Sequence, residues 1–231
     1  MRGSVLRVGV GVLTVALLAA VVIAGVVVSD APEARSMDLG SGSAWFASRR
    51  ARAAVLIDGA SGDSIKRVAG ALASDQVEVE QDGSSALVVD RAAGTVARID
   101  GATWLPSEAK PVSSRNDASL RVLTAGGVAW AIGQDTTLVQ QFDTGDLSVI
   151  GEPQTVPNRV SGAAVSRTGT LWVTSPTGEV RSYRDGRPVA TSQVQGMRDA
   201  TLVMAGDDPV LVDRVTHAAH GLDPDSGEVV R

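Results

Sequence analysis

The chain has 231 residues, a formal net charge of −5, 3% aromatic residues and no cysteine. Without cysteine, the fold cannot depend on disulfides or thiolate metal sites. The negative charge argues against a nucleic-acid partner, since proteins that bind the phosphate backbone usually carry a basic stripe. The scarcity of aromatic rings weakens a carbohydrate-binding interpretation.

The N-terminal region predicts a membrane anchor. Residues 8–28 form a run of 21 residues without a charge, long enough to cross about 30 Å of hydrocarbon as a helix. Arg2 and Arg7 precede the run, so residues 1–7 are expected in the cytoplasm and the rest of the chain outside it. This predicts a single-pass protein of the cell membrane, with the cytoplasmic membrane as a partner through residues 8–28.

A cleaved signal peptide is the alternative. Its apolar region normally spans only about 7–15 residues and ends in a small-x-small cleavage site. Residues 26–29, Val-Val-Val-Ser, make a poor site of that kind. The sequence therefore favours an anchor that is not cleaved.

A short polar linker, residues 29–36, contains Pro32, which disfavours continuation of the helix. Two signals then recur in phase over residues 37–231. Apolar strand centres are separated by 42, 43, 42 and 39 residues: Trp45, Leu87, Trp130, Trp172 and Leu211. Asp-led turns are separated by 42, 43, 42 and 38 residues: Asp58, Asp100, Asp143, Asp185 and Asp223. A period of roughly 40–45 residues with several short strands per unit is typical of a β-propeller blade.

The predicted fold is all-β: a β-propeller of about five four-stranded blades after one transmembrane helix. The blades are expected at about 37–70, 75–113, 117–156, 159–195 and 199–231. The Asp-led turns are expected to join third and fourth strands as tight hairpins. The first strand is expected at 37–39 and the last at 228–231, and five units either close a small ring or form an incomplete one.

One segment allows a second interpretation. Ile65, Val68, Ala69 and Leu72 have helical spacing, so Ser61–Ser74 fits a short helix. The phase of the repeat instead places a strand there, at 64–68, and we expect the strand.

The conspicuous side chains have structural explanations. Trp45, Trp130 and Trp172 share one repeat position, which predicts core between blades, whereas Trp104 is out of phase and is expected as a packed edge residue or a surface anchor for a partner. Calcium needs six to eight oxygens converging on one point, and one Asp per blade cannot supply them. The dense acidic turn of residues 223–228 is likewise expected to be an ordinary turn.

His217 and His220 are the only histidines. A spacing of three places them on opposite faces of a strand, which suits neither joint metal ligation nor catalysis. Arg49, Arg50 and Arg52 are expected to form a solvated loop. The sequence therefore predicts no catalytic, cofactor-binding or metal-ligating residues and no cofactor.

Residues 37–48 and 55–62 resemble the N-terminal region of large envelope proteins of actinobacteria. In that family a membrane anchor precedes a propeller-like repeat region, and fibronectin type III or immunoglobulin-like domains follow. The turns at 57–62 and 142–145 are also similar to those of quinoprotein-like and other bacterial surface propellers. The resemblance implies fold rather than activity, and this sequence departs from the family by ending at Arg231 without downstream modules.

Together these features predict a membrane-anchored extracytoplasmic β-propeller that binds or scaffolds at the bacterial cell envelope. Its ligand is expected to be a protein or a cell-wall polymer, bound by loops on one rim. The alternative is a propeller-type enzyme or accessory module that acts on envelope polysaccharide, as a glycoside hydrolase or lyase, or a quinoprotein-like dehydrogenase. Because no carboxylate pair or catalytic motif stands out, the sequence favours a non-enzymatic role.

Overall fold

The computed structural model describes residues 42–71, 73–113, 117–133, 137–156 and 159–230. The predicted cytoplasmic segment, transmembrane helix, linker and first strand all fall before residue 42 and lie outside the described residues. Within the described ranges, no helix has the length and apolar character needed to cross a membrane.

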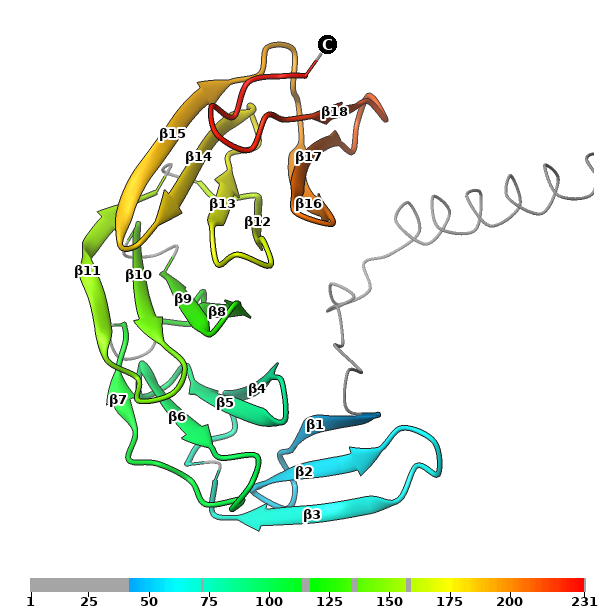
Figure 1. Cartoon of the computed structure of the whole chain (residues 1–231), viewed down its shortest axis with the longest axis vertical. Coiled ribbons are helices and arrows are strands. Elements are labelled where there is room, and N and C mark those ends of the chain that lie inside the picture. The colour runs from blue at the N-terminus through cyan, green and yellow to red at the C-terminus, as the bar shows by residue number, and fades with distance from the viewer. Residues whose placement is uncertain (1–41, 72, 114–116, 134–136, 157–158, 231) are drawn as a thin grey trace, which may run out of the picture. The chain divides into compact units, whose positions relative to one another are not determined.

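Five antiparallel sheets follow one another in chain order, as Figure 1 shows. We call them blades 1 to 5. Blade 1 contains β1 (Ser43–Ser48), β2 (Ala53–Asp58) and β3 (Ser64–Ala69). Blade 2 contains β4 (Val77–Asp82), β5 (Ser85–Asp90), β6 (Thr95–Ile99) and β7 (Lys110–Pro111). Blade 3 contains β8 (Arg121–Ala125), β9 (Val128–Gly133), β10 (Leu138–Asp143) and β11 (Val149–Thr155).

Blade 4 contains β12 (Gly162–Val165), β13 (Leu171–Thr174), β14 (Glu179–Arg184) and β15 (Arg187–Gln193). Blade 5 contains β16 (Ala200–Ala205), β17 (Asp208–Asp213) and β18 (Ala219–Gly221). Every strand pairs with its neighbours in sequence within its sheet. The first described strands of successive blades also contact each other, from β1 to β4, β8, β12 and β16. The all-β, propeller-like prediction is confirmed.

The row of blades does not close into a ring. Among the described residues, β16–β18 form no packed pair with β1–β3. Of the two predicted alternatives, the closed ring of five blades is therefore wrong and the incomplete ring is correct. The prediction of a strand at 228–231 is wrong for residues 228–230, which the structure describes. There, only an isolated bridge joins Val229 to Leu222. The helix considered at 61–74 is replaced by the strand β3.

Each inner blade buries two faces. We call the face toward the preceding blade upstream and the face toward the following blade downstream. Between blades 1 and 2, for example, the downstream residues Trp45 and Leu56 pack with the upstream residues Val88 and Ile99. Four such apolar clusters occupy the four junctions between blades. The core is therefore divided among the junctions rather than gathered in one centre.

The register corrects one predicted repeat position. The second strands of blades 2 and 5 both end in an aspartate, Asp90 and Asp213. When these two aspartates are aligned, Leu87 corresponds to Val210, because each lies three residues before its aspartate. The spacing along the sequence instead predicts Leu211 at that position. A slip of one residue moves a side chain to the other face of the sheet. Leu211 is accordingly buried in the upstream junction with blade 4, while Val210 lies on the downstream face.

Candidate functional site

The tryptophans at the repeat position bind one blade to the next. The indole Nε1–H of Trp45 donates to the carbonyl of Ser84 at 3.0 Å, and that of Trp130 donates to Gly169 at 2.9 Å. Both acceptors lie in the turn between the first two strands of the following blade. Trp172 is also buried, 1% exposed. The prediction that these three residues form core between blades is confirmed.

Polar side chains add further ties across the junctions. The Gln81 amide accepts from the Trp45 backbone N–H at 3.3 Å and donates to the Ser43 carbonyl at 3.1 Å. It thus occupies part of the edge of β1, where a neighbouring strand would pair. The backbone carbonyl of Gln81 accepts a hydrogen bond from the Thr124 hydroxyl at 3.0 Å, which connects blades 2 and 3. These bonds fix blades 1, 2 and 3 against one another.

Blades 3 and 4 also meet at two glycines, Gly151 and Gly186. The buried Gln141 side chain accepts from the Gly186 N–H at 2.5 Å. A Cβ at Gly186 would lie 2.7 Å from the Gly151 Cα, and both glycines have a φ of +68°. Only glycine allows this conformation and this approach together. The junction is therefore closed by backbone contact as well as by apolar packing.

The Asp-led loops share one geometry. In each of six loops, the N–H four residues after the aspartate donates to the aspartate carbonyl at 2.8–3.0 Å; they begin at Asp58, Asp90, Asp100, Asp143, Asp213 and Asp223. The aspartate Oδ1 also accepts from one or both of the intervening N–H groups at positions two and three. The residue at the fourth position is left-handed, with φ between 58° and 75°. These are Asx turns, in which a side chain replaces backbone pairing.

Two parts of the turn prediction change. Only Asp185, with φ of 53° before Gly186 at 68°, forms the tight two-residue hairpin predicted for all five turns. The loops at Asp90 and Asp213 were missed because they follow second strands rather than third strands. The loop at Asp90 could have been recognised from the sequence, because a glycine lies four residues after the aspartate. In the loop at Asp213 that fourth position is occupied by His217 instead.

Hydrogen bonds favour the ionised form of three of these carboxylates, those of Asp58, Asp100 and Asp223. Backbone N–H groups, first that of Ser61, lower the pKa of Asp58, and the Ser226 N–H does the same for the pKa of Asp223. The Arg98 guanidinium, together with the Thr103 amide, lowers the pKa of Asp100 strongly. These oxygens are already committed to local donors. In the part of the chain that the structure describes, no group of three or more His, Asp or Glu side chains is placed to hold a metal ion.

Burial opposes ionisation at Asp213, but the N–H groups of Val215 and Arg198 outweigh it and lower the pKa to about 2. Asp213 is fully buried and begins the loop after β17. Its two oxygens accept from the loop and from the segment before β16. This aspartate is therefore a structural anchor of blade 5.

The remaining candidates lie apart from one another. His217 is exposed in a left-handed turn position, whereas His220 lies in β18 opposite Leu211, so the predicted strand over both histidines was wrong. Trp104 packs against the first junction with the Lys66 ammonium 4.8 Å from its ring centre, which supports the packed-edge interpretation. The exposed basic cluster lies on the turn between β1 and β2: Arg49, Arg50 and Arg52.

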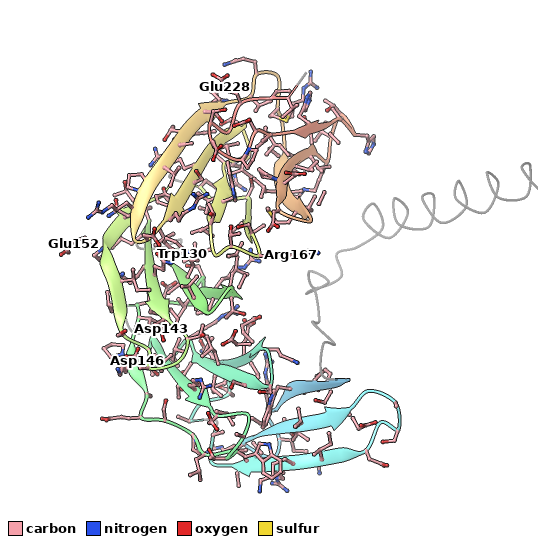
Figure 2. The ribbon with its side chains drawn as sticks, viewed as in Figure 1. Trp130, Asp143, Asp146, Glu152, Arg167 and Glu228 are labelled. Atoms are coloured by element: carbon pink, nitrogen blue, oxygen red, sulfur yellow. The ribbon has the colours of Figure 1, made fainter. Side chains whose placement is uncertain are left out.

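One rim of the blades gathers acidic groups. In an antiparallel meander, the turn after the first strand and the turn after the third strand lie at the same end. In blade 1 the strand β2 matches the third strand of the other blades. Figure 2 shows Asp143 and Asp146 in the turn after β10 and Arg167 in the turn before β13. Exposed carboxylates on these turns include Asp63, Asp146, Asp185, Asp207 and Asp225. A ligand approaching this rim meets a predominantly negative surface.

Comparison with known proteins shows the fold alone. No family model and no curated protein matches the chain. A functionally unknown protein from Desulfotomaculum acetoxidans is similar with a TM-score of 0.60 and 12% identity, over 82% of this chain and 65% of that one. The computationally designed Ika8 protein has a TM-score of 0.55 and 10% identity, over 78% and 55%. BamB from Moraxella catarrhalis, a β-propeller, has a TM-score of 0.50 and 15% identity, over 79% and 55%.

Proposed function

We propose that the chain is a membrane-anchored extracytoplasmic module that binds or scaffolds at a bacterial envelope. The observation that carries this proposal is the propeller-like row of blades, tied together by Trp45, Gln81, Trp130 and Gln141. Such ties hold the loops of each rim at fixed positions, as recognition by loops requires. The apolar run of residues 8–28 supports the anchor.

A pair of reporter fusions tests the location. Alkaline phosphatase, active only outside the cytoplasm, and a reporter active only in the cytoplasm are each fused after Val230 and expressed in a bacterium. We expect phosphatase activity in the membrane fraction that resists extraction by carbonate. A matched control that lacks residues 8–28 should lose both export and membrane association. Activity of the cytoplasmic reporter alone would contradict the proposed topology.

A second experiment tests binding. The full chain in mild detergent is mixed with purified cell-wall sacculi, and with envelope proteins retained on a matrix that carries the chain. We expect saturable retention of one of these two ligand classes, weakened by replacing exposed rim residues such as Asp146 and Asp185 with alanine. Matched replacements of Glu152, which projects from β11 (Figure 2), should leave retention unchanged. Absence of retention in both assays would contradict the binding role.

A further inference from the structure

The two terminal blades each present an apolar face that no described blade covers. On blade 1, Phe46, Val55 and Arg67 lie side by side across the upstream face, and Phe46 is 37% exposed. On blade 5, Val203 and Val210 pair across the downstream face, and Val203 is 46% exposed. Exposed apolar patches of this kind mark surfaces that meet a partner.

Equivalent positions inside the row show what these faces are built to contact. The residues that correspond to Phe46 in blades 2 to 5 are buried against the preceding blade, at 0–4% exposure: Val88, Ala131, Val173 and Leu211. Those that correspond to Val210 in blades 1 to 4 are buried against the following blade, at 0–5% exposure: Trp45, Leu87, Trp130 and Trp172. The two terminal faces are therefore the two halves of an interface that the chain forms four times within itself.

The terminal blades also carry opposite charge. Residues 42–71 contain five basic and two acidic side chains, and the basic ones include the exposed Arg49, Arg50 and Arg67. Residues 199–230 contain seven acidic side chains and one arginine, with Asp208 on the downstream face itself. Opposite charges on two surfaces steer them together and disfavour pairing of like with like.

We propose that blade 5 of one copy of this chain packs its downstream face on the upstream face of blade 1 of a second copy. The apolar match comes from the repeat, and the charges of the two blades select head-to-tail pairing over the pairing of identical faces. A heterologous contact of this type continues from copy to copy unless the rotation closes a ring. The association is a property of the described blades and does not depend on the proposed envelope location.

Light scattering coupled to size-exclusion chromatography tests the proposal on the full chain in dodecyl maltoside. The wild-type chain should show masses above one copy that rise with protein concentration and fall as salt is raised from about 50 mM to about 500 mM. Phe46→Asp and Val203→Asp should each weaken association at least about tenfold, because a carboxylate would be buried without a partner. Val189→Asp, at a position 44% exposed on the outer strand β15, is the matched control and should change nothing.

Mixing the two variants distinguishes the proposed arrangement from its alternatives. Phe46→Asp retains an intact blade 5 face and Val203→Asp an intact blade 1 face, so the mixture should form a one-to-one dimer and nothing larger. Circular dichroism checks that each variant is folded. A double variant with reversed charge, Arg49→Glu with Arg50→Glu, leaves the apolar face unchanged and should also weaken association.

Several results would overturn the proposal. One is a single-copy mass for the wild-type chain at high protein concentration and low salt. Another is association that neither variant changes, which would assign it to residues 8–28. A third is self-pairing of Phe46→Asp to the wild-type extent, which would show that identical faces meet. Binding of the two faces only to a different protein, with no second copy present, would also contradict it.

Discussion

The same repeat position lies in two different environments: in the junction between blades 3 and 4, and on the downstream face of blade 5. At the junction, Trp130 is fully buried, packs 6.1 Å from Tyr183 between ring centres and donates a hydrogen bond to the next blade. On the downstream face of blade 5, Val210 is half-buried and faces no described blade. The comparison shows that the stability of this protein resides in the contacts between sheets, since a single three- or four-stranded sheet cannot bury both of its faces.

The largest effect is expected at the junction position itself. Trp130→Ala should lower the free energy of unfolding by about 3–5 kcal/mol, the usual cost of removing a buried aromatic side chain. Val210→Ala, at the equivalent position on the open face, should cost about 1 kcal/mol or less. Urea denaturation of the full chain in mild detergent, followed by far-ultraviolet circular dichroism, measures both. Equal losses would contradict the division between closed and open faces.

The next effect tests the close approach of the two backbones. Gly186→Ala should destabilise by about 2–4 kcal/mol, because it adds both a left-handed alanine and an overlap with blade 3. Gly206→Ala is a matched control, since its φ is +73° and no atom lies within 4 Å of an added Cβ. It should cost only about 1 kcal/mol. The same denaturation experiment should separate the two variants, and similar costs would show that the contact at Gly186 contributes little.

A smaller effect is expected from the polar tie at the same junction. Gln141→Ala leaves the buried N–H of Gly186 without its acceptor and should cost about 1–3 kcal/mol. Gln154→Ala removes a side chain that donates only to the nearby Glu152 carbonyl, and should be close to neutral. Thermal melting of the two variants provides the measurement. A neutral Gln141→Ala would mean that water replaces the glutamine there.

The smallest effect concerns four of the turn aspartates, Asp58, Asp100, Asp213 and Asp223, whose contribution to stability is present at neutral pH and is lost in acid. Their folded pKa values are lowered, to about 2 for Asp213, so the stability they contribute is present above the ordinary pKa of about 4 and is lost as the pH falls toward about 2. The melting temperature should therefore be level from about pH 7 to pH 5 and decline below about pH 4. Asp213→Asn should flatten part of this decline. A melting temperature that stays unchanged as the pH approaches the folded pKa of Asp213 would refute the assignment.

The repeat makes the fold predictable, because spacing along the chain reports blade-to-blade contact directly. The tryptophans and the aspartate spacing are enough to place four of the five second strands in the correct phase. The error at Leu211 arises because the step from Trp172 to Val210 is 38 residues, against 42 or 43 for the earlier steps, and because the second strand of blade 5 is apolar at consecutive positions, 210 to 212. With no alternation there, sequence alone cannot tell which side chain faces which neighbour.

The loops are less predictable because one conformation is reached with different residues. The left-handed position is occupied by Gly62, Gly94 and Gly227 in three loops, but by Trp104, Leu147 and His217 in the others. Glycine is the usual signal for that conformation, and the Asx bonds of the leading aspartate stabilise it where glycine is absent. For the same reason, the histidine at 217 belongs to a turn rather than to the strand predicted for it.

The division of the core among junctions has a consequence for synthesis on the ribosome. Each blade completes its downstream core only when the next blade emerges, about 42 residues later. At about 5–20 residues per second, an apolar sheet face therefore waits roughly 2–8 s for its cover. The ordered growth of the row gives chaperones four recurring occasions to bind.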